Sequence, residues 1–397
     1  MLGGADVGPL SGFTVISIEQ AVAAPFATRQ LADLGARVIK IERPDGGDFA
    51  RGYDGTVGGS SSYFAWLNRA KESMTLDLKT PGARTILNQL LAGADVFVHN
   101  LAPGAMSRLG YGRDVLAARY PNVIDCVVSG YGSSGSWHDR KAYDLIVQAE
   151  AGLLSITGTP DEPARVGISV ADIAAGMYAF SGVLSALLHR LRTKEVKAVE
   201  VSLFDSLAEW MSAPMYYAKY SGQQPRRIGA AHSTIAPYGA FATADRLMIV
   251  AVQNNREWRT FCECILVRPE LADDPRFVDN SARVANRSQL DEIIALRLAG
   301  EPATTVAGQL DEAGIAYGMV NPISGLIEHA VLSERGRWVT VESPGGPIAA
   351  MLPPTTLTGM EPLMGPVPAL GQHTHAVLSG LGYDDDSIAS LRADGCV

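Results

Sequence analysis

Asp172 is the side chain whose position in this sequence points most clearly to nucleophilic chemistry. It follows the run Val166-Gly-Ile-Ser-Val-Ala and opens a predicted helix whose first turns, residues 173–182, carry no other charge. A helix N-terminus favours negative charge and apolar neighbours limit hydration, so an ionised, weakly solvated carboxylate is expected there. Such a carboxylate is a possible nucleophile, but an Asp at a helix start is also a common N-cap. The residues alone leave both roles open.

Basic residues are the second chemical feature, because they recur at the ends of predicted strands and in loops. They are Lys40, Arg43, Arg108, Arg140 and Lys141. Ligands of open α/β sheets bind at this edge, so together these cations predict a local site for an anion such as a polyphosphate. The chain as a whole has 33 Lys and Arg against 42 Asp and Glu, a formal charge of −9. This balance argues against nucleic acid or a membrane as a partner.

The elements that must position these side chains alternate between strands and helices. Strands are predicted from β-branched runs at residues 14–18, 37–42, 73–77, 95–99, 123–129 and 198–203. Helices are predicted from apolar spacing at residues 25–34, 81–92 and 172–191. This alternation favours a mostly parallel sheet covered by helices, the α/β class. The apolar run 173–188 is shorter than the about 20 residues that cross a bilayer, so it is interpreted as a buried helix.

The sequence divides into two domains. Its 397 residues, 47% of them hydrophobic, suffice for two cores. We expect a large α/β domain over residues 1–205, a linker helix over 206–228, a small α+β domain over 229–336, and a returning segment over 337–397 that completes the large domain. The run Ser221-Gly-Gln-Gln-Pro marks the break before the small domain.

Three other motifs are weaker. Gly130-Tyr-Gly-Ser-Ser-Gly135 formally matches the dinucleotide pattern, but it does not lie in the first βα turn, where a nicotinamide site needs it. Gly167-Ile-Ser-Val-Ala lacks the second glycine of a serine hydrolase nucleophile elbow. The pairs His373/His375 and Cys262/Cys264 have no further partners at zinc-site spacing, so no metal is expected.

The cysteines and the N-terminus bear on the cellular compartment. Four scattered cysteines are too few for a disulfide framework in so long a chain and fit a reducing environment. The first six residues have neither the basic nor the apolar region of a secretory signal. We therefore expect a cytoplasmic protein.

Seven segments stand out together along nearly the whole chain. They are residues 34–44 (Leu-Gly-Ala-Arg-Val-Ile-Lys-Ile-Glu-Arg-Pro), 68–79, 94–110, 129–132, 142–145, 170–176 and 368–374. In this order they resemble the family III CoA-transferases, the group that also contains formyl-CoA transferase, carnitine CoA-transferase and the α-methylacyl-CoA racemases. Within it, residues 231–238 look most like the branch that uses succinyl-CoA and a second dicarboxylate such as glutarate.

The resemblance implies a fold and a set of site residues. The fold is a Rossmann-like large domain built from both ends of the chain, a small domain from the middle, and two ring-like subunits interlocked as a homodimer. The family's nucleophilic aspartate falls on Asp172. Its CoA-contacting positions fall on Gln20, Ala21, Ala23, Arg43, Leu76, Asn100, Leu101, Arg108, Lys141 and Tyr143. CoA and acyl-CoA are substrates in this family, and no tightly bound cofactor is expected.

The implied mechanism suits a carboxylate. Asp172 would attack the acyl-CoA thioester to give a mixed anhydride and CoA thiolate, and an aspartyl-CoA thioester would then pass CoA to an acceptor acid. With an ordinary pKa of about 3.9, Asp172 is expected to be ionised at neutral pH without a general base. Backbone amides at the start of its own helix or in the first βα turn would stabilise the oxyanions. The sequence does not separate these two sources.

Departures from the family pattern narrow the function. The racemases carry a histidine where this chain has Tyr143, which disfavours racemase activity and leaves it as an alternative, beside a non-catalytic CoA-binding protein. The formyl-CoA transferases carry a run of glycines where this chain has residues 229–239, which argues against oxalate or formyl chemistry. Our hypothesis is that His232 and Ser233, with Arg226 or Arg227 nearby, receive the distal carboxylate of the acceptor. A purely structural role for His232 is equally open.

Overall fold

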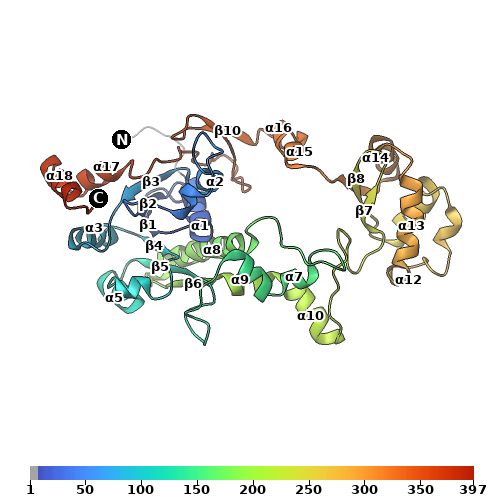
Figure 1. The fold of residues 1–397 in the computed structure, drawn as a ribbon, viewed down its shortest axis with the longest axis horizontal. Coiled ribbons are helices and arrows are strands. Elements are labelled where there is room, and N and C mark those ends of the chain that lie inside the picture. Colours follow the sequence, from blue (N-terminus) through green and yellow to red (C-terminus); the bar gives the residue numbers. More distant parts are fainter. Residues whose placement is uncertain (1–7) are drawn as a thin grey trace. The chain divides into compact units, whose positions relative to one another are not determined.

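The computed structural model describes residues 8–397, which form two compact units (Figure 1). Unit 1 contains the chain up to Gly152 together with Val166–Ala213 and Glu334–Val397. Unit 2 contains Leu153–Arg165 and Pro214–Ser333. The first six residues, on which the expectation of no secretory signal rests, lie outside the described part of the chain.

This division differs from the expected one chiefly at residues 153–165, which the sequence assigns to the large domain. In the structure they belong to unit 2, because their loop is bonded to the segment that leads into it. The Gly229 N–H donates to the Gly158 carbonyl at 2.9 Å. The Arg227 guanidinium donates to the carbonyls of Thr159 and Pro160 at 2.9 and 3.0 Å.

Unit 1 is built on a six-stranded parallel sheet. Its strands are β1 (Thr14–Ile18), β2 (Arg37–Glu42), β3 (Lys71–Thr75), β4 (Val96–His99), β5 (Ile124–Ser129) and β6 (Val199–Ser202). The strands lie in the order β3-β2-β1-β4-β5-β6 (Figure 1). Successive strands are added on one side of β1 up to β3 and on its other side from β4 onward, and open sheets of this kind bind ligands at this switch between β1 and β4. The predicted α/β class and parallel sheet are confirmed.

Helices cover both faces of this sheet, which explains why its strands are largely buried. One face is covered by α3 (Pro81–Ala92), α5 (Arg113–Arg119), α17 (Thr374–Gly380) and α18 (Asp385–Ala393). On the other face α1 (Ala23–Asp33) packs against α8 (Val170–Thr193), and α8 contacts β5 and β6. The remaining elements of unit 1 are η1 (Phe49–Gly52), α2 (Ser62–Asn68), α4 (Ala105–Arg108), α6 (Asp144–Glu150), α9 (Leu203–Trp210), β10 (Trp338–Val341) and β11 (Ile348–Met351).

Within residues 8–397, α8 is the one helix whose length and composition would allow it to cross a membrane. Its small residues, among them Ala171, Ala175 and Ala179, are buried in unit 1. We therefore assign α8 as a core helix of this unit, in agreement with the sequence-based interpretation.

Unit 2 has a three-stranded antiparallel sheet in the order β7-β8-β9. Its strands are β7 (Tyr238–Ala242), β8 (Leu247–Ala251) and β9 (Ala316–Met319). Trp258, Phe261 and Phe277 lie at the centre of its separate apolar core. Its helices include α7 (Leu153–Ile156), α10 (Ser212–Ser221), α11 (Asn255–Thr260), α12 (Asn280–Ala285), α13 (Arg287–Leu298), α14 (Ala303–Ala313) and α15 (Ile323–Ile327), and α16 (Ala330–Glu334) closes it.

Candidate active site

The loop between β1 and α1 lies where the strand order reverses. The Gln20 N–H donates to Asn100 Oδ1 at 2.8 Å, and Asn100 Nδ2 donates back to the Gln20 carbonyl at 2.9 Å. Asn100 directly follows β4, which pairs with β1 through Ile18 and His99. Two of the predicted CoA positions, Gln20 and Asn100, are therefore in direct contact at the carboxyl edge of the sheet.

The first turn of α1 presents backbone donors without partners. Ala21 has a φ of +62°, the left-handed region that a non-glycine residue rarely adopts, and its N–H donates to Asp48 Oδ1 at 2.9 Å. Among the described residues, the N–H groups of Val22, Ala23 and Ala24 have no acceptor, and no side chain caps the helix. Free donors at the start of an eleven-residue helix favour an anion.

Asp172 is the third residue of α8, whose N-cap is Ser169. In the described part of the chain its carboxylate accepts no hydrogen bond, so Asp172 is not the cap. Desolvation, and after it the charge of Asp144, raises the pKa of Asp172 to about 7. The expectation of full ionisation at neutral pH is therefore wrong, because burial makes the charged form costly.

The carboxylate of Asp144, at the start of α6, accepts hydrogen bonds from two backbone N–H groups in the first turn of α8. Its Oδ1 accepts from the N–H of Ala171 at 2.8 Å and of Asp172 at 3.4 Å. The neighbouring amides of Val170 and Ile173 donate to backbone carbonyls. At the start of α8 the N–H groups of residues 170–173 all have acceptors, and among the described residues only the N–H of its N-cap, Ser169, has none. The start of α1 has three free N–H groups. Of the two oxyanion sources that the sequence leaves open, the geometry favours the first βα turn.

A close approach of α1 and α8 joins these two features. A Cβ built on Gly176 would lie 2.7 Å from the Ala23 carbonyl oxygen, which is closer than real Cβ atoms come. Gly176 lies one helical turn, about 6 Å, beyond Asp172 along α8. The turn that carries Asp172 is therefore adjacent to the start of α1.

Tyr53, which the sequence does not single out, belongs to the same region. Burial, and then the charges of Asp48 and Asp172, raises the pKa of its phenol. Its ring packs edge-on against Tyr63, with 5.7 Å between centroids. Tyr143, a predicted CoA position, also acts on this phenol and is itself exposed. No sequence pattern around Tyr53 indicates a role in the site, since only the tertiary fold brings it near Asp172.

The predicted phosphate-binding cations are available to solvent. Arg43 and Arg108 are exposed and donate to nearby carbonyls, those of Gly47 and Pro103, each at 3.3 Å. The Arg43 guanidinium also lies over the Phe49 ring, 5.3 Å from its centroid. Lys141 is also exposed. The apolar CoA positions differ from them: Leu76 is buried and Leu101 is half-buried against the same core.

Two other basic residues of the predicted anion site have side-chain partners in the structure. Lys40, expected to contribute to an anion site, is fully buried and pairs with Asp48 at 2.5 Å. The Arg140 guanidinium stacks on the Trp137 ring, with 3.7 Å to the centroid. The expectation for Lys40 is wrong because the loop after β2 folds back over it and brings Asp48 into contact.

The comparison with known proteins decides the family. The sequence model of CoA-transferase family III matches residues 10–374. The chain belongs to CoA-transferase family III. It is 34% identical over 394 residues to the succinyl-CoA:glutarate CoA-transferase of Mus musculus, covering 98% of this chain and 90% of that protein. It is 37% identical over 349 residues to the acetyl-CoA:oxalate CoA-transferase of Acetobacter aceti, covering 86% and 89%.

Solved structures give the same result for this family III chain. A CAIB/BAIF family protein from Brucella suis superposes with a TM-score of 0.85 and 31% sequence identity, covering 95% of this chain and all of that one. The resemblance stated from the sequence is confirmed, and with it the assignment of the chain as a CoA-transferase of this family.

The residues predicted to select the acceptor lie in unit 2 of the family III chain. The His232 ring stacks on Tyr238, with 5.2 Å between centroids and 16° between planes. The His232 N–H donates to the Tyr238 carbonyl at 2.8 Å. Ser233 and Arg226 are exposed, whereas Arg227 is bound to carbonyls of its own unit. Backbone contacts thus define the conformation of this loop.

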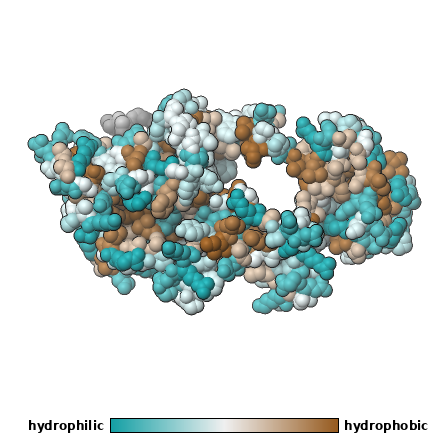
Figure 2. Space-filling model, in the orientation of Figure 1, coloured by the Kyte–Doolittle hydropathy of each residue, from teal (hydrophilic) through white to brown (hydrophobic). Residues whose placement is uncertain are grey.

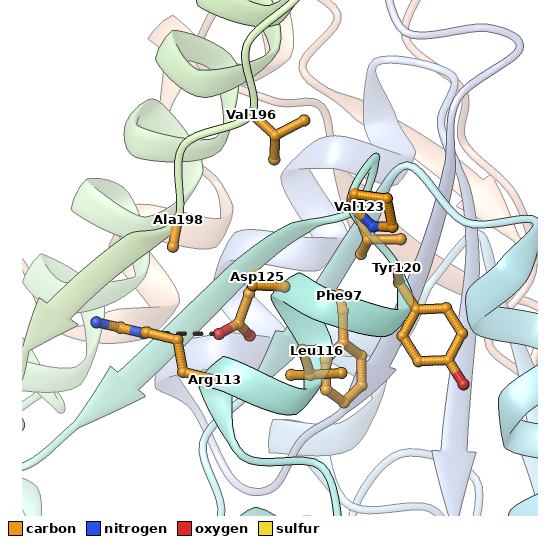
Figure 3. Close-up of a pocket in the computed structure, with 10 residues that line it drawn as sticks. Phe97, Arg113, Leu116, Tyr120, Val123, Asp125, Val196 and Ala198 are labelled. Carbon is orange, nitrogen blue, oxygen red and sulfur yellow. Dashed lines mark ion pairs between the residues drawn. The ribbon is translucent and has the colours of Figure 1, made fainter.

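Unit 1 contains a cavity of about 270 Å³ at the amino ends of β5 and β6 (Figure 3). Figure 3 shows Asp125 directed toward Arg113, with 3.9 Å between Oδ2 and Nε, and His99 Nε2 lies 3.5 Å from the other carboxylate oxygen. The predicted CoA positions of this family III chain follow the opposite, carboxyl ends of the strands. The cavity is therefore not part of the candidate site.

The weaker sequence motifs have structural roles here. His373 Nδ1 accepts from the Ser73 N–H at 3.1 Å, and His375 pairs with Asp385 at 2.9 Å. Cys262 is buried in unit 2, while Cys264 is exposed.

A Cβ on Gly130 would lie 2.3 Å from the Cβ of Ala142, so glycine there lets the segment of Lys141 and Tyr143 approach the sheet.

Proposed function

We propose that this chain transfers CoA from succinyl-CoA to a dicarboxylic acid, with Asp172 as the acyl carrier. The observation that carries the proposal is a carboxylate without a hydrogen-bond partner among the described residues, held one turn from the point where α8 meets the Ala23 carbonyl in the first turn of α1. Its raised pKa fits a nucleophile, because a poorly solvated carboxylate is more reactive than a hydrated one.

In the proposed reaction the Asp172 carboxylate carries a series of covalent intermediates. The ionised Asp172 attacks the thioester carbonyl, the C–S bond breaks, and CoA leaves as the thiolate. The thiolate then attacks the aspartyl carbonyl of the mixed anhydride, which releases succinate and leaves an aspartyl-CoA thioester. The acceptor carboxylate attacks this thioester to give a second anhydride and CoA thiolate, and the thiolate takes the acceptor acyl group. Asp172 returns as a carboxylate, and no proton is consumed.

Each of these attacks places negative charge on a carbonyl oxygen. The N–H groups of Val22, Ala23 and Ala24 are the donors that we assign to it, because the N–H groups of Ala171 and Asp172 in α8 are already bonded to Asp144. Preorganised backbone donors of this kind stabilise a tetrahedral oxyanion more than the ground-state carbonyl.

CoA would bind along the carboxyl edge of the sheet. The exposed guanidinium groups of Arg43 and Arg108 would pair with its phosphates, and Lys141 would add a third cation. Leu76 and Leu101 supply apolar surface beside the adenine or the pantetheine. Gln20, Ala21, Ala23, Asn100 and Tyr143 would surround the thioester end.

His232 and Ser233 are our candidates for the distal carboxylate of the acceptor. The names of several relatives motivate a dicarboxylate, including the succinyl-CoA:glutarate enzyme of Mus musculus and a succinyl-CoA:mesaconate CoA-transferase of Haloarcula hispanica. The acetyl-CoA:oxalate relative makes oxalate a second candidate acceptor, although this chain lacks the glycine run of the formyl-CoA transferases.

A homodimer is part of the proposal, since several helices expose apolar side chains that a second copy would cover. Figure 2 shows α15 and α16 as a patch of hydrophobic residues. Exposed apolar residues include Met177, Leu188 and Leu191 on α8, Tyr216 and Tyr220 on α10, Ile323 and Ile327 on α15, and Val331 on α16.

The test is a CoA-exchange assay read by mass spectrometry. The protein receives succinyl-CoA with equal concentrations of glutarate, mesaconate, oxalate and a monocarboxylate. A new dicarboxyl-CoA, lost in Asp172→Ala, is the expected result, and hydroxylamine added during turnover should trap Asp172 as its hydroxamate. Exchange of an α-proton of a branched acyl-CoA with deuterated water, without CoA transfer, would assign the racemase reaction instead.

A further inference from the structure

A cluster of buried charges lies beneath the β1–α1 loop, and none of its side chains takes part in the reaction above. We name it the lysine–carboxylate network; its members are Glu19, Lys40, Asp48, Asn68 and Lys71. All five residues are at most 2% exposed. Two ammonium groups and two carboxylates make the network neutral in total.

One amide oxygen joins the two ion pairs of the network. Lys40 Nζ lies 2.5 Å from Asp48 Oδ2, and Lys71 Nζ lies 2.8 Å from Glu19 Oε1. Asn68 Oδ1 accepts from both ammonium groups at 3.0 Å. Displacement of any one member therefore disturbs the other pair as well.

The network contacts both ends of the segment that carries the free amides. Asp48 Oδ1 accepts from the N–H of Ala21 and of Ala50, each at 2.9 Å. Lys71 Nζ donates to the Pro25 carbonyl at 3.0 Å. Between these two points lie the unpartnered N–H groups of residues 22–24.

Stability alone does not account for these charges. Two ions taken out of water lose several kcal/mol of hydration each, and apolar side chains of the same volume are often at least as stabilising. A left-handed alanine, in contrast, persists only where its surroundings hold it. Ala21 is such a residue, and the network supplies the acceptor for its amide.

We propose that the lysine–carboxylate network is a positioning device for acyl transfer: Lys40 orients Asp48, and Asp48 holds Ala21 so that the following amides stay open to the thioester oxygen. This inference rests on the function proposed above. The site is close, because Ala21 directly precedes the three free amides, and the first turn of α1 contacts α8 at Gly176, one turn beyond Asp172. Lys40 and Asp48 are positioning residues, since neither touches the reacting atoms.

The kinetic test uses Asp48→Asn. The amide cannot accept from Ala21 through one atom and from Lys40 through the other, so the loop loses one of its constraints. We expect kcat to fall about 100-fold, the loss seen when one preorganised oxyanion donor is removed, while KM for the acyl-CoA changes less than threefold. A loss confined to KM would overturn the proposal.

Asp33→Asn is the matched control. Asp33 is a buried partner of Arg29 and Arg69, at 2.5 and 2.8 Å, near the other end of α1. This variant removes a buried carboxylate from the same unit without touching the β1–α1 loop, so its kcat should stay within threefold of the wild-type value. An equal loss of kcat in both variants would mean a general structural effect and would overturn the proposal.

Hydrogen exchange of the peptide spanning residues 19–25 gives a readout that needs no activity. The Ala21 amide should exchange at least tenfold faster in Asp48→Asn than in the wild type or in Asp33→Asn. Unchanged exchange would overturn the proposal. If the wild-type protein transfers no CoA, the proposed function fails, and this measurement still decides whether the network holds the loop. If Asp48→Asn does not fold, Lys40→Arg is measured in the same way, because the larger guanidinium displaces Asp48 while keeping the charge.

Discussion

Arg287 holds the backbone of the His232 loop through two carbonyl oxygens. Its Nη2 donates to the carbonyls of His232 and Ile235, both at 2.7 Å. Arg287 is the first residue of α13, so a helix of unit 2 anchors the loop on both sides of Ser233. The loop proposed to bind the acceptor is thus built on a rigid support.

The first prediction concerns this anchor. Arg287→Met should raise KM for the dicarboxylate acceptor about tenfold and leave KM for succinyl-CoA unchanged, because only the acceptor loop loses its support. Steady-state kinetics with each substrate varied in turn will measure this. Arg297→Met is the control on the same helix, since among residues 8–397 the Arg297 side chain pairs only with Glu301 and Gln309. Equal changes in both KM values would argue against an acceptor-specific loop.

The second prediction concerns the acceptor itself. His232→Ala should abolish transfer to glutarate and keep transfer to monocarboxylates, because the side chain that receives the distal carboxylate is gone. The measurement is the ratio of the two products when both acids compete. An unchanged ratio would leave His232 with a structural role, as its stacking on Tyr238 alone would suggest.

The third prediction follows from the raised pKa of Asp172, about 7. Since only the carboxylate is nucleophilic, kcat/KM should fall tenfold for each pH unit below 7. Asp144→Asn removes the neighbouring charge, so the acid limb of the profile should move to lower pH. It should remain above the ordinary range of Asp, because desolvation is the larger cause. A limb that does not move would mean that another group sets it.

The fourth prediction applies the same pKa to stability. A carboxyl whose pKa is raised in the folded state contributes its full stability below its unfolded pKa, near 4, and loses it as the pH rises through 7. Asp172→Asn, which cannot ionise, should therefore be more stable than the wild type at pH 8.5 by about 1–4 kcal/mol. The two should converge at pH 4. Urea unfolding at both pH values measures this, and an equal difference at both would contradict it.

The fifth prediction concerns the packing of α1 on α8. Gly176→Val places atoms against the Ala23 carbonyl and should cost about 1–3 kcal/mol of stability and most of the activity, because the start of α1 shifts. Gly308→Ala in α14 is the control, since a Cβ there meets nothing within 4 Å. It should be neutral or slightly stabilising. Thermal unfolding and CoA exchange will compare the two variants.

Sequence patterns within single segments predicted the strands and the core helix of unit 1. β-branched runs identified the six parallel strands, and the uncharged run after Asp172 identified the core helix α8. Residues 153–165 were misplaced because their partners, such as Gly229 and Arg227, lie about seventy positions away. Pairing at that distance leaves no periodic signal.

The electrostatic state of the site could not be predicted in the same way. The ionisation of Asp172 depends on Asp144 and on burial, and the role of Lys40 depends on Asp48 folding back over it. A titratable group takes its properties from neighbours that only the tertiary structure supplies. Tyr53 was missed for the same reason.

The assembly of unit 1 from separate stretches of chain sets an order for folding on the ribosome. The edge strand β3 is completed by the C-terminal segment: the Thr75 N–H donates to Thr374 Oγ1 at 3.0 Å, across 299 positions. All of unit 2 is synthesised before Thr374 leaves the exit tunnel. The β3 edge of the nascent sheet therefore stays without its C-terminal partner while unit 2 is synthesised. During that interval chaperones can bind the exposed edge, and the edge can also pair with other chains and aggregate.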